Sequence, residues 1–182
     1  MTGFMAGSTV KTARNLTLVA TLALGLSACF RPLYGPTASG APLSAVLASI
    51  QVDPAKTAPG QERLGHYLRS ELVFDLDGSG QPSEKKYRLT LTASETVQTP
   101  IVSSITGRAE SATLLGTAAY KVQTLSGDRT LTEGVAQGTA TYDRSSQRFA
   151  SLRAARDAEI RLAKLLSEQI KTRVAAILAT QP

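Results

Sequence analysis

The sequence predicts an α+β fold, in which a four-stranded mixed or antiparallel sheet is covered on one face by two helices. Three runs in the middle of the chain alternate apolar and polar residues, as half-buried strands do. One segment before these runs and one after them repeat apolar residues every three or four positions, as amphipathic helices do. A sheet with one polar face needs cover on one side only, which makes a two-layer sandwich. The predicted order is strand, helix, strand, strand, strand, helix.

The first predicted strand and helix precede the three alternating runs. Residues 46–53 end in the alternation Ile50, Gln51, Val52, and Pro54 stops the strand. Residues 61–74 then predict a helix, because they carry leucines four positions apart. The leucines of this stripe are Leu64, Leu68 and Leu72.

The rest of the domain is predicted to be a strand meander closed by one long helix. The strands span 85–98, 111–124 and 130–142, and the last is richer in threonine and glycine. Residues 144–178 contain no proline or glycine, which predicts an uninterrupted helix. The residues that recur along it at spacing three or four are Leu152, Ala155, Glu159, Leu162, Leu166, Ile170, Val174 and Ile177. Basic residues such as Lys164 and Lys171 are predicted to form its solvated outer face.

The single cysteine, Cys29, closes a pattern typical of bacterial lipoprotein signals. Lys11 and Arg14 precede an apolar run over 16–26, and small residues stand directly before the thiol. An ordinary thiol and an uncleaved membrane helix are the alternatives. The helix is too short, because a bilayer span needs about 20 apolar residues and this run contains threonines. We therefore expect Cys29 to carry diacylglycerol and an acyl chain, and about two chains suffice for stable anchoring.

These observations divide the chain into residues 1–28 as signal, 29–44 as lipidated N terminus and tether, and 45–182 as a single domain. Removing the signal takes away two positive charges and lowers the formal net charge from +6 to +4. With the only cysteine lipidated, no disulfide can form, and folding depends on the core. A mildly basic exported protein fits acidic partners such as lipid head groups, and export argues against nucleic acid.

Several segments resemble the LptE family of lipopolysaccharide-assembly lipoproteins, most of all its alphaproteobacterial branch. The resemblance runs through nearly the whole mature chain. It is carried by Cys29 with the following Phe-Arg-Pro-Leu-Tyr-Gly, by Ile50-Gln51-Val52, by the segment from Arg63-Leu64 to Glu71-Leu72, by Tyr87-Arg88-Leu89 and by the segment from Phe149 to Ile170. Phe30 follows the cysteine directly, where many members of the family carry a glycine.

The resemblance implies a lipid-anchored protein of the outer membrane, facing the periplasm. It implies a plug inside an LptD-type β-barrel that binds lipopolysaccharide during its delivery to the outer leaflet. An accessory or scaffold lipoprotein of another envelope transport complex is the alternative, because the same fold can serve either role.

No catalytic, metal or cofactor site is predicted. His66 is the only histidine, and we expect it to be solvated or partly packed. Asp75 and Asp77 lack further acids at calcium-ligand spacing, so a turn is the expected role of this segment. Asp157 and Glu159 are two positions apart on a helix and face different ways, which argues against a carboxylate pair.

Positive side chains near the predicted meander are the candidates for lipopolysaccharide binding. Arg108 lies in the connection after the second strand, Lys121 on the third strand and Arg129 in the following turn. An arginine can bind a lipid A phosphate through two charge-assisted hydrogen bonds. The alternative is that each is an ordinary solvated charge.

Overall fold

The computed structural model describes residues 37, 40–78, 83–99, 102, 104 and 107–180. All of them belong to one compact unit, Pro36–Pro182. The predicted signal and Cys29 lie outside the described residues. No helix in the described part of the chain combines the length and apolar character that crossing a bilayer requires.

The elements follow the predicted order, with two short additions. The helices are α2 (Leu43–Ala48), α3 (Glu62–Leu76) and α4 (Arg148–Thr180). The strands are β1 (Ile50–Val52), β2 (Lys56–Thr57), β3 (Tyr87–Gln98), β4 (Ser111–Thr124) and β5 (Thr130–Asp143). The additions are α2 and β2, and the α+β two-layer fold class is confirmed.

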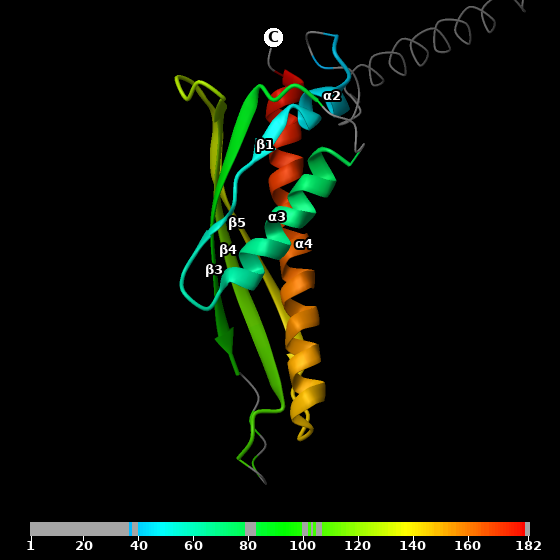
Figure 1. Cartoon of the computed structure of the whole chain (residues 1–182). Helices are drawn as coiled ribbons and strands as arrows, with labels where there is room; N and C mark the ends of the chain where they lie inside the picture. The colour runs from blue at the N-terminus through cyan, green and yellow to red at the C-terminus, as the bar shows by residue number, and fades with distance from the viewer. Residues whose placement is uncertain are drawn as a thin grey trace, which may run out of the picture. The chain divides into compact units, whose positions relative to one another are not determined.

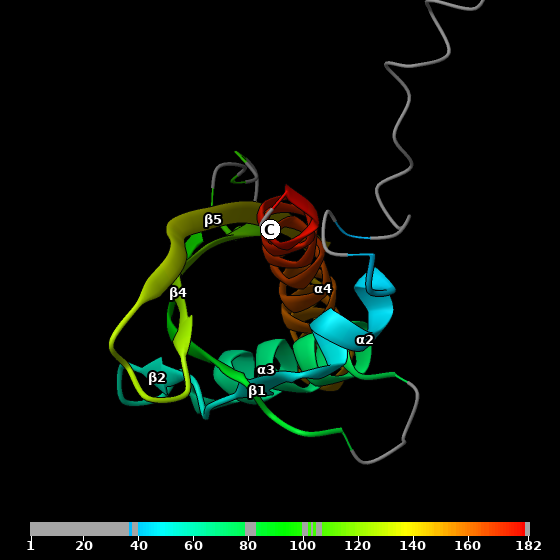
Figure 2. The same cartoon turned by 90° about the horizontal axis from the view of Figure 1, so that it is seen from above.

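One mixed sheet carries all the strands, in the order β1-β3-β4-β5, with β2 also paired to β3. β1 and β2 run parallel to β3, whereas β3, β4 and β5 form the predicted antiparallel meander. Seen from above, the sheet curves, and α3 and α4 lie along its concave side (Figure 2). Figure 1 shows the same two layers from the side.

The core lies between the concave face of the sheet and the two long helices. The predicted leucines of α3 are fully buried, and Leu89, Leu91 and Ala93 of β3 face them from the sheet. α4 contributes its middle and C-terminal half, beginning with Ala158. Its largest buried side chains are Leu162, Leu166, Ile170 and Val174.

Three details of the prediction are corrected by the structure. Residues 46–48 are helical, because Leu43 and Leu47 stand four apart and both are buried in the core. This places the expected tether boundary at residue 44 inside α2. Leu152 and Ile177 are 61% and 37% exposed. The buried stripe of α4 therefore begins later than predicted, at Ala158, and ends with Leu178 in place of Ile177. Lys171 is not on a fully solvated face, because its ammonium group contacts the Asp75 carboxylate of α3 at 3.2 Å.

Side chains form hydrogen bonds with backbone groups at both edges of the sheet. On β5, three carbonyls accept hydrogen bonds from α4: Thr141 from Arg161 at 3.0 Å, Gln137 from Gln169 at 2.8 Å, and Val135 from Arg173 at 2.6 Å. On β3, the side-chain amide of Gln61 donates to the Glu95 carbonyl at 2.8 Å and accepts from the Glu95 amide at 3.0 Å. Polar side chains therefore stand in for missing neighbour strands at these positions.

Candidate functional site

The three candidate cations lie far apart on the sheet. Arg108 precedes the first residue of β4, Lys121 lies near the end of that strand, and Arg129 lies in the turn that follows it. A strand rises about 3.4 Å per residue, so the 14 residues of β4 separate Arg108 from Arg129 by roughly 45 Å. Figure 1 shows the start of β4 and the β4–β5 turn at opposite ends of the sheet. The three side chains therefore do not form one site.

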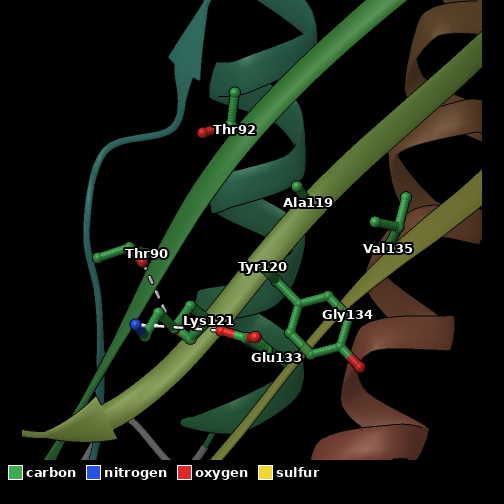
Figure 3. Close-up of a pocket in the computed structure, with 8 residues that line it drawn as sticks. All are labelled: Thr90, Thr92, Ala119, Tyr120, Lys121, Glu133, Gly134 and Val135. Carbon is green, nitrogen blue, oxygen red and sulfur yellow. Dashed lines mark hydrogen bonds and ion pairs between the residues drawn. The ribbon is translucent and has the colours of Figure 1, made fainter. Parts of the chain in front are cut away.

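Lys121 lines a shallow hollow of about 340 Å³ on the sheet, formed by β3, β4 and β5 (Figure 3). Its ammonium nitrogen lies 4.0 Å from a carboxylate oxygen of Glu133, and the two side chains point toward each other. Among the described residues, Lys121 is the only basic residue and Glu133 the only acidic residue that line this hollow. Because the charges offset each other, this hollow offers little attraction for an anion.

Arg129 belongs to a turn that contains its own acid. The Asp128 carboxylate accepts hydrogen bonds from the hydroxyls of Ser126, at 2.6 Å, and of Thr124. These two hydrogen bonds hold the pKa of Asp128 below its usual value, so the carboxylate is negative beside Arg129. The turn is therefore mixed in charge.

Arg108 lies at the other end of the sheet, where it lines a hollow together with two further arginines. Residues 108–109 before β4, the end of β5 and the start of α4 line a hollow of about 580 Å³, and its basic residues are Arg108, Arg144 and Arg148. Ser145, Ser146 and Ser151 also line it, and no acidic residue does among those described. We call this the basic hollow.

Local hydrogen bonds fix the walls of the basic hollow. The Arg144 amide donates to the Glu110 carbonyl at 2.8 Å, which joins the β5–α4 connection to the start of β4. The Ser145 amide donates to the Ser151 hydroxyl at 2.9 Å, and that hydroxyl lies 2.9 Å from the Ser145 carbonyl. The Ser145 hydroxyl accepts from the Gln147 amide at 3.1 Å, just before α4 begins. These hydrogen bonds hold the backbone of the β5–α4 connection, which carries Arg144 and leads to Arg148.

The start of α4 has an unusual charge distribution for a helix. Its first turn contains no acidic residue and includes Arg148. A helix N terminus is positive, so a cation there is unfavourable by about 0.3–1 kcal/mol, whereas a bound anion is favourable. An anion in the basic hollow would offset both the arginines and the helix dipole.

A second hollow, of about 570 Å³, adjoins the first along α4. Arg63, Arg153, Arg156 and Asp157 line it together with apolar residues. The apolar lining residues are Phe149, Leu152, Ala155 and Ile160. Leu152 and Ala155 line both hollows, so the two hollows lie side by side on either side of these residues.

Arg63 also belongs to a partly buried cluster of charges beneath the second hollow. It makes a two-fold ion pair with Glu159, at 2.6 and 3.0 Å, and Glu159 is 4% exposed. The contact with Glu159 raises the pKa of Arg63 further. Burial, and then the negative charge of Glu159, raise the pKa of the nearby Glu95 carboxyl, which Arg63 only partly offsets. This cluster ties α3, α4 and β3 together.

The sequence prediction missed the arginines that surround Arg108. The helical pattern of the sequence puts Arg148, Arg153 and Arg156 on the same solvated face as Lys164, and it assigns no role to Arg63 or Arg144. A usable signal was present: in a meander, the β3–β4 connection and the end of β5 lie at one end of the sheet, and the β4–β5 turn lies at the other. This topology places Arg108 beside Arg144 and away from Arg129.

The other residues considered in the sequence have structural contacts. His66 is exposed on α3. Asp75 lies within α3, not in a turn, and accepts a hydrogen bond from the Ser167 hydroxyl at 2.8 Å. Asp77 pairs with Lys85 at 2.8 Å. Asp157 pairs with Arg161, while Glu159 pairs with Arg63, so these two carboxylates face different partners as expected. Within the described ranges, no group of three or more potential metal ligands is present.

Comparison with known proteins shows the fold. No family model and no curated protein matches the chain. A crystal structure of a predicted lipoprotein from Caulobacter crescentus is similar, with 23% identity and a TM-score of 0.59 over 76% of this chain and 97% of that one. A rare lipoprotein B from Shewanella oneidensis aligns at 14% identity and a TM-score of 0.42, over 68% of this chain and 97% of that one. The first likeness shows that the described domain has the fold of the Caulobacter protein.

Proposed function

We propose that this protein is an LptE-like lipoprotein, anchored in the outer membrane through Cys29, that binds lipopolysaccharide and plugs an LptD-type β-barrel. The lipoprotein signal before Cys29, the resemblance along the mature sequence and the fold shared with the Caulobacter protein support this proposal. The observation that carries it is the basic hollow, in which Arg108, Arg144 and Arg148 converge.

Phosphate is the chemical group that best fits the basic hollow. Guanidinium groups bind phosphate oxygens in pairs, and serine hydroxyls donate further hydrogen bonds. The lining includes three guanidinium groups and the hydroxyls of Ser145 and Ser146, whereas the Ser151 hydroxyl already donates to the Ser145 carbonyl. No acidic residue lines this hollow among those the structure describes. A glycolipid that carries phosphates on its sugar head group would be held by charge, and no bond would be made or broken.

The first experiment measures lipopolysaccharide binding after charge reversal in the basic hollow. Arg144→Glu combined with Arg148→Glu should weaken binding to immobilised lipopolysaccharide by on the order of tenfold or more, because each phosphate-pairing charge becomes repulsive. The fold should survive, since both residues are exposed and a glutamate in the first turn of α4 suits the helix dipole. Circular dichroism checks the fold.

The matched control reverses the two other candidate cations. Lys121→Glu combined with Arg129→Glu changes the net charge by the same amount, at positions outside the basic hollow. We expect a much smaller loss of affinity, from long-range charge alone. Equal losses in the two double variants would show that binding follows net charge, and the proposed site would be wrong. Lipopolysaccharide stripped of its lipid A phosphates should compete poorly for the wild-type protein.

The partner half of the proposal is tested separately. The tagged full-length protein, extracted from membranes in mild detergent, should co-purify with a large outer-membrane β-barrel. The basic-hollow variant should retain this barrel, because packing of a plug depends on shape and apolar area more than on two charges. Recovery of a different envelope complex would favour the accessory-subunit alternative.

A further inference from the structure

Phenylalanine and leucine side chains are exposed beside arginines on the first turns of α4. Phe149 is 72% exposed, Leu152 is 61% exposed and Ile160 is 38% exposed. Arg153 and Arg156 lie between them along the helix, and the Arg153 guanidinium stands 5.9 Å from the centre of the Phe149 ring. We call these five residues the amphiphilic surface. Burial of a large apolar side chain typically stabilises a protein by about 1.5–3 kcal/mol. The exposure of Phe149 and Leu152 next to each other therefore points to a binding surface.

We propose that the amphiphilic surface docks onto an anionic lipid surface, with Phe149 and Leu152 entering the interface and Arg153 and Arg156 pairing with lipid phosphates. The proposal goes beyond binding of one glycolipid in the basic hollow. It concerns different arginines, and Leu152 is the one residue of the amphiphilic surface that also lines that hollow.

The arrangement of apolar and basic groups fits a lipid–water interface. Phe149 and Leu152 are three positions apart, so they project from the same side of α4. Helices that lie in such an interface place aromatic and leucine side chains in the apolar layer and arginines at the head groups. Long arginine side chains can run along apolar groups while their charged ends reach phosphate. The contact between Arg153 and Phe149 keeps a charge beside the inserting ring.

Charge selects an anionic lipid over a second copy of this chain. Among the described residues, the lining of the two adjoining hollows includes six arginines, of which Arg63 pairs with Glu159. It includes one acid, Asp157, which already pairs with Arg161. A symmetric dimer through this surface would place arginines against arginines. Anionic lipid head groups attract such arginines instead, and the attraction falls off within a Debye length.

Tryptophan substitution gives a direct test, because the chain contains no tryptophan. Phe149→Trp places a single fluorophore in the amphiphilic surface. The matched control is Phe74→Trp, since Phe74 on α3 is also 72% exposed but lines neither hollow. Each full-length variant is mixed with excess vesicles of phosphatidylglycerol and phosphatidylcholine whose acyl chains are brominated. The N-terminal segment is identical in both variants, so any vesicle binding that it contributes is shared.

We expect strong quenching and a blue shift for Trp at 149, and severalfold weaker changes for Trp at 74. Vesicles of phosphatidylcholine alone should quench Trp at 149 much less, and added salt should reduce the quenching on anionic vesicles. Adding Arg153→Glu and Arg156→Glu to the Phe149→Trp variant should reduce the quenching severalfold, with an unchanged circular dichroism spectrum.

Equal quenching at 149 and 74 would overturn the proposal, and so would quenching that is the same on neutral and anionic vesicles. A third outcome would also overturn the proposal. If the Phe149→Trp variant shows no quenching by lipid, and a separate Phe149→Ser, Leu152→Ser variant loses a β-barrel partner, the surface binds a protein and not a lipid. Loss of lipopolysaccharide binding in the basic-hollow variant with normal quenching at 149 would leave the lipid-surface proposal standing, so the two proposals can fail independently.

Discussion

At the scale of single residues, two paired glycines set how closely α4 approaches the sheet. Gly116 of β4 and Gly138 of β5 are cross-strand partners beneath Leu162. A Cβ atom at residue 116 would lie 2.7–3.0 Å from three carbon atoms of Leu162, whereas one at 138 would find its nearest atom at an ordinary 3.4 Å. Only at residue 116 would a methyl group force the helix or the Leu162 rotamer to move.

Gly116→Ala should therefore destabilise the protein by about 1–3 kcal/mol, which is typical of an overpacked core. Gly138→Ala is the control and should be neutral or slightly stabilising, because alanine restricts the unfolded strand more than glycine does. Urea unfolding of the two variants measures the difference. A loss at residue 138 as large as at residue 116 would contradict the packing described here.

Glu95 gives a residue-scale prediction about pH. Burial and the Glu159 carboxylate raise its pKa above the ordinary 4.5, and one of its carboxylate oxygens is buried without a hydrogen-bond partner in the structure. The folded state therefore binds this proton more tightly than the unfolded state does. The resulting contribution to stability is complete below 4.5 and is lost as the pH rises through the folded pKa.

Replacing the carboxyl by an uncharged amide should remove this dependence. We expect Glu95→Gln to melt at a higher temperature than wild type at neutral pH, and the gap to close as the pH falls toward 4.5. Glu168→Gln, at an exposed position of α4, is the control and should show little gap at either pH. A gap for Glu95→Gln that stays constant across this range would show that charge burial is not its cause.

At the scale of elements, α4 acts on β5 as a substitute neighbour strand. Its side chains at 161, 169 and 173 donate to carbonyls at 141, 137 and 135, so the helix runs antiparallel to the strand. Eight helical residues rise about 12 Å and four strand residues about 13–14 Å, so the first two contacts match in spacing. The carbonyls belong to alternate residues, which share the outer side of an edge strand.

Removing these donors should make β5 available for pairing with another chain. The triple variant Arg161→Ala, Gln169→Ala and Arg173→Ala should self-associate more than wild type as its concentration rises, because unpaired edge strands promote edge-to-edge contact. Analytical ultracentrifugation measures this, with Lys164→Ala and Glu168→Ala as the control on the same helix. Wild-type behaviour of the triple variant at every concentration would mean that the curvature of the sheet protects the edge.

The long elements could be predicted because their apolar patterns repeat many times. β4 has the predicted bounds, 111–124, and the leucines of α3 are buried as expected. α2 and β2 were missed, because six and two residues are too few to establish a period. Leu152 continues the apolar pattern of α4 but is exposed. It lies in the part of the helix before Ala158, where no residue is buried. A periodic sequence shows which side of a helix can be buried, and the tertiary fold decides how far along it that burial extends.

At the scale of the whole molecule, the domain has two distant ends that share one core. α4 alone spans about 50 Å with its 33 residues, and the basic hollow lies at its N-terminal end. Composition revealed a basic protein without showing where the charge gathers. Arg108 was identified from its place in a connection, but its neighbours Arg144 and Arg148 follow β5 in the sequence, so only the chain topology brings them together.

The last prediction concerns the part of the chain that precedes the described domain. The described core begins in α2, so the Cys29 thiol is expected to serve anchoring and not folding. Cys29→Ser should abolish palmitate labelling and shift the protein out of the lipid-anchored membrane fraction, because a hydroxyl cannot take the thioether-linked lipid. The folded domain should keep the wild-type free energy of unfolding to within about 0.5 kcal/mol, as is usual for a surface substitution. Ser27→Ala, which keeps a small residue before the thiol, is the control and should still be labelled. Palmitate incorporation into Cys29→Ser would show that the signal has been misread, and a large drop in melting temperature would show that the segment around Cys29 belongs to the folded domain.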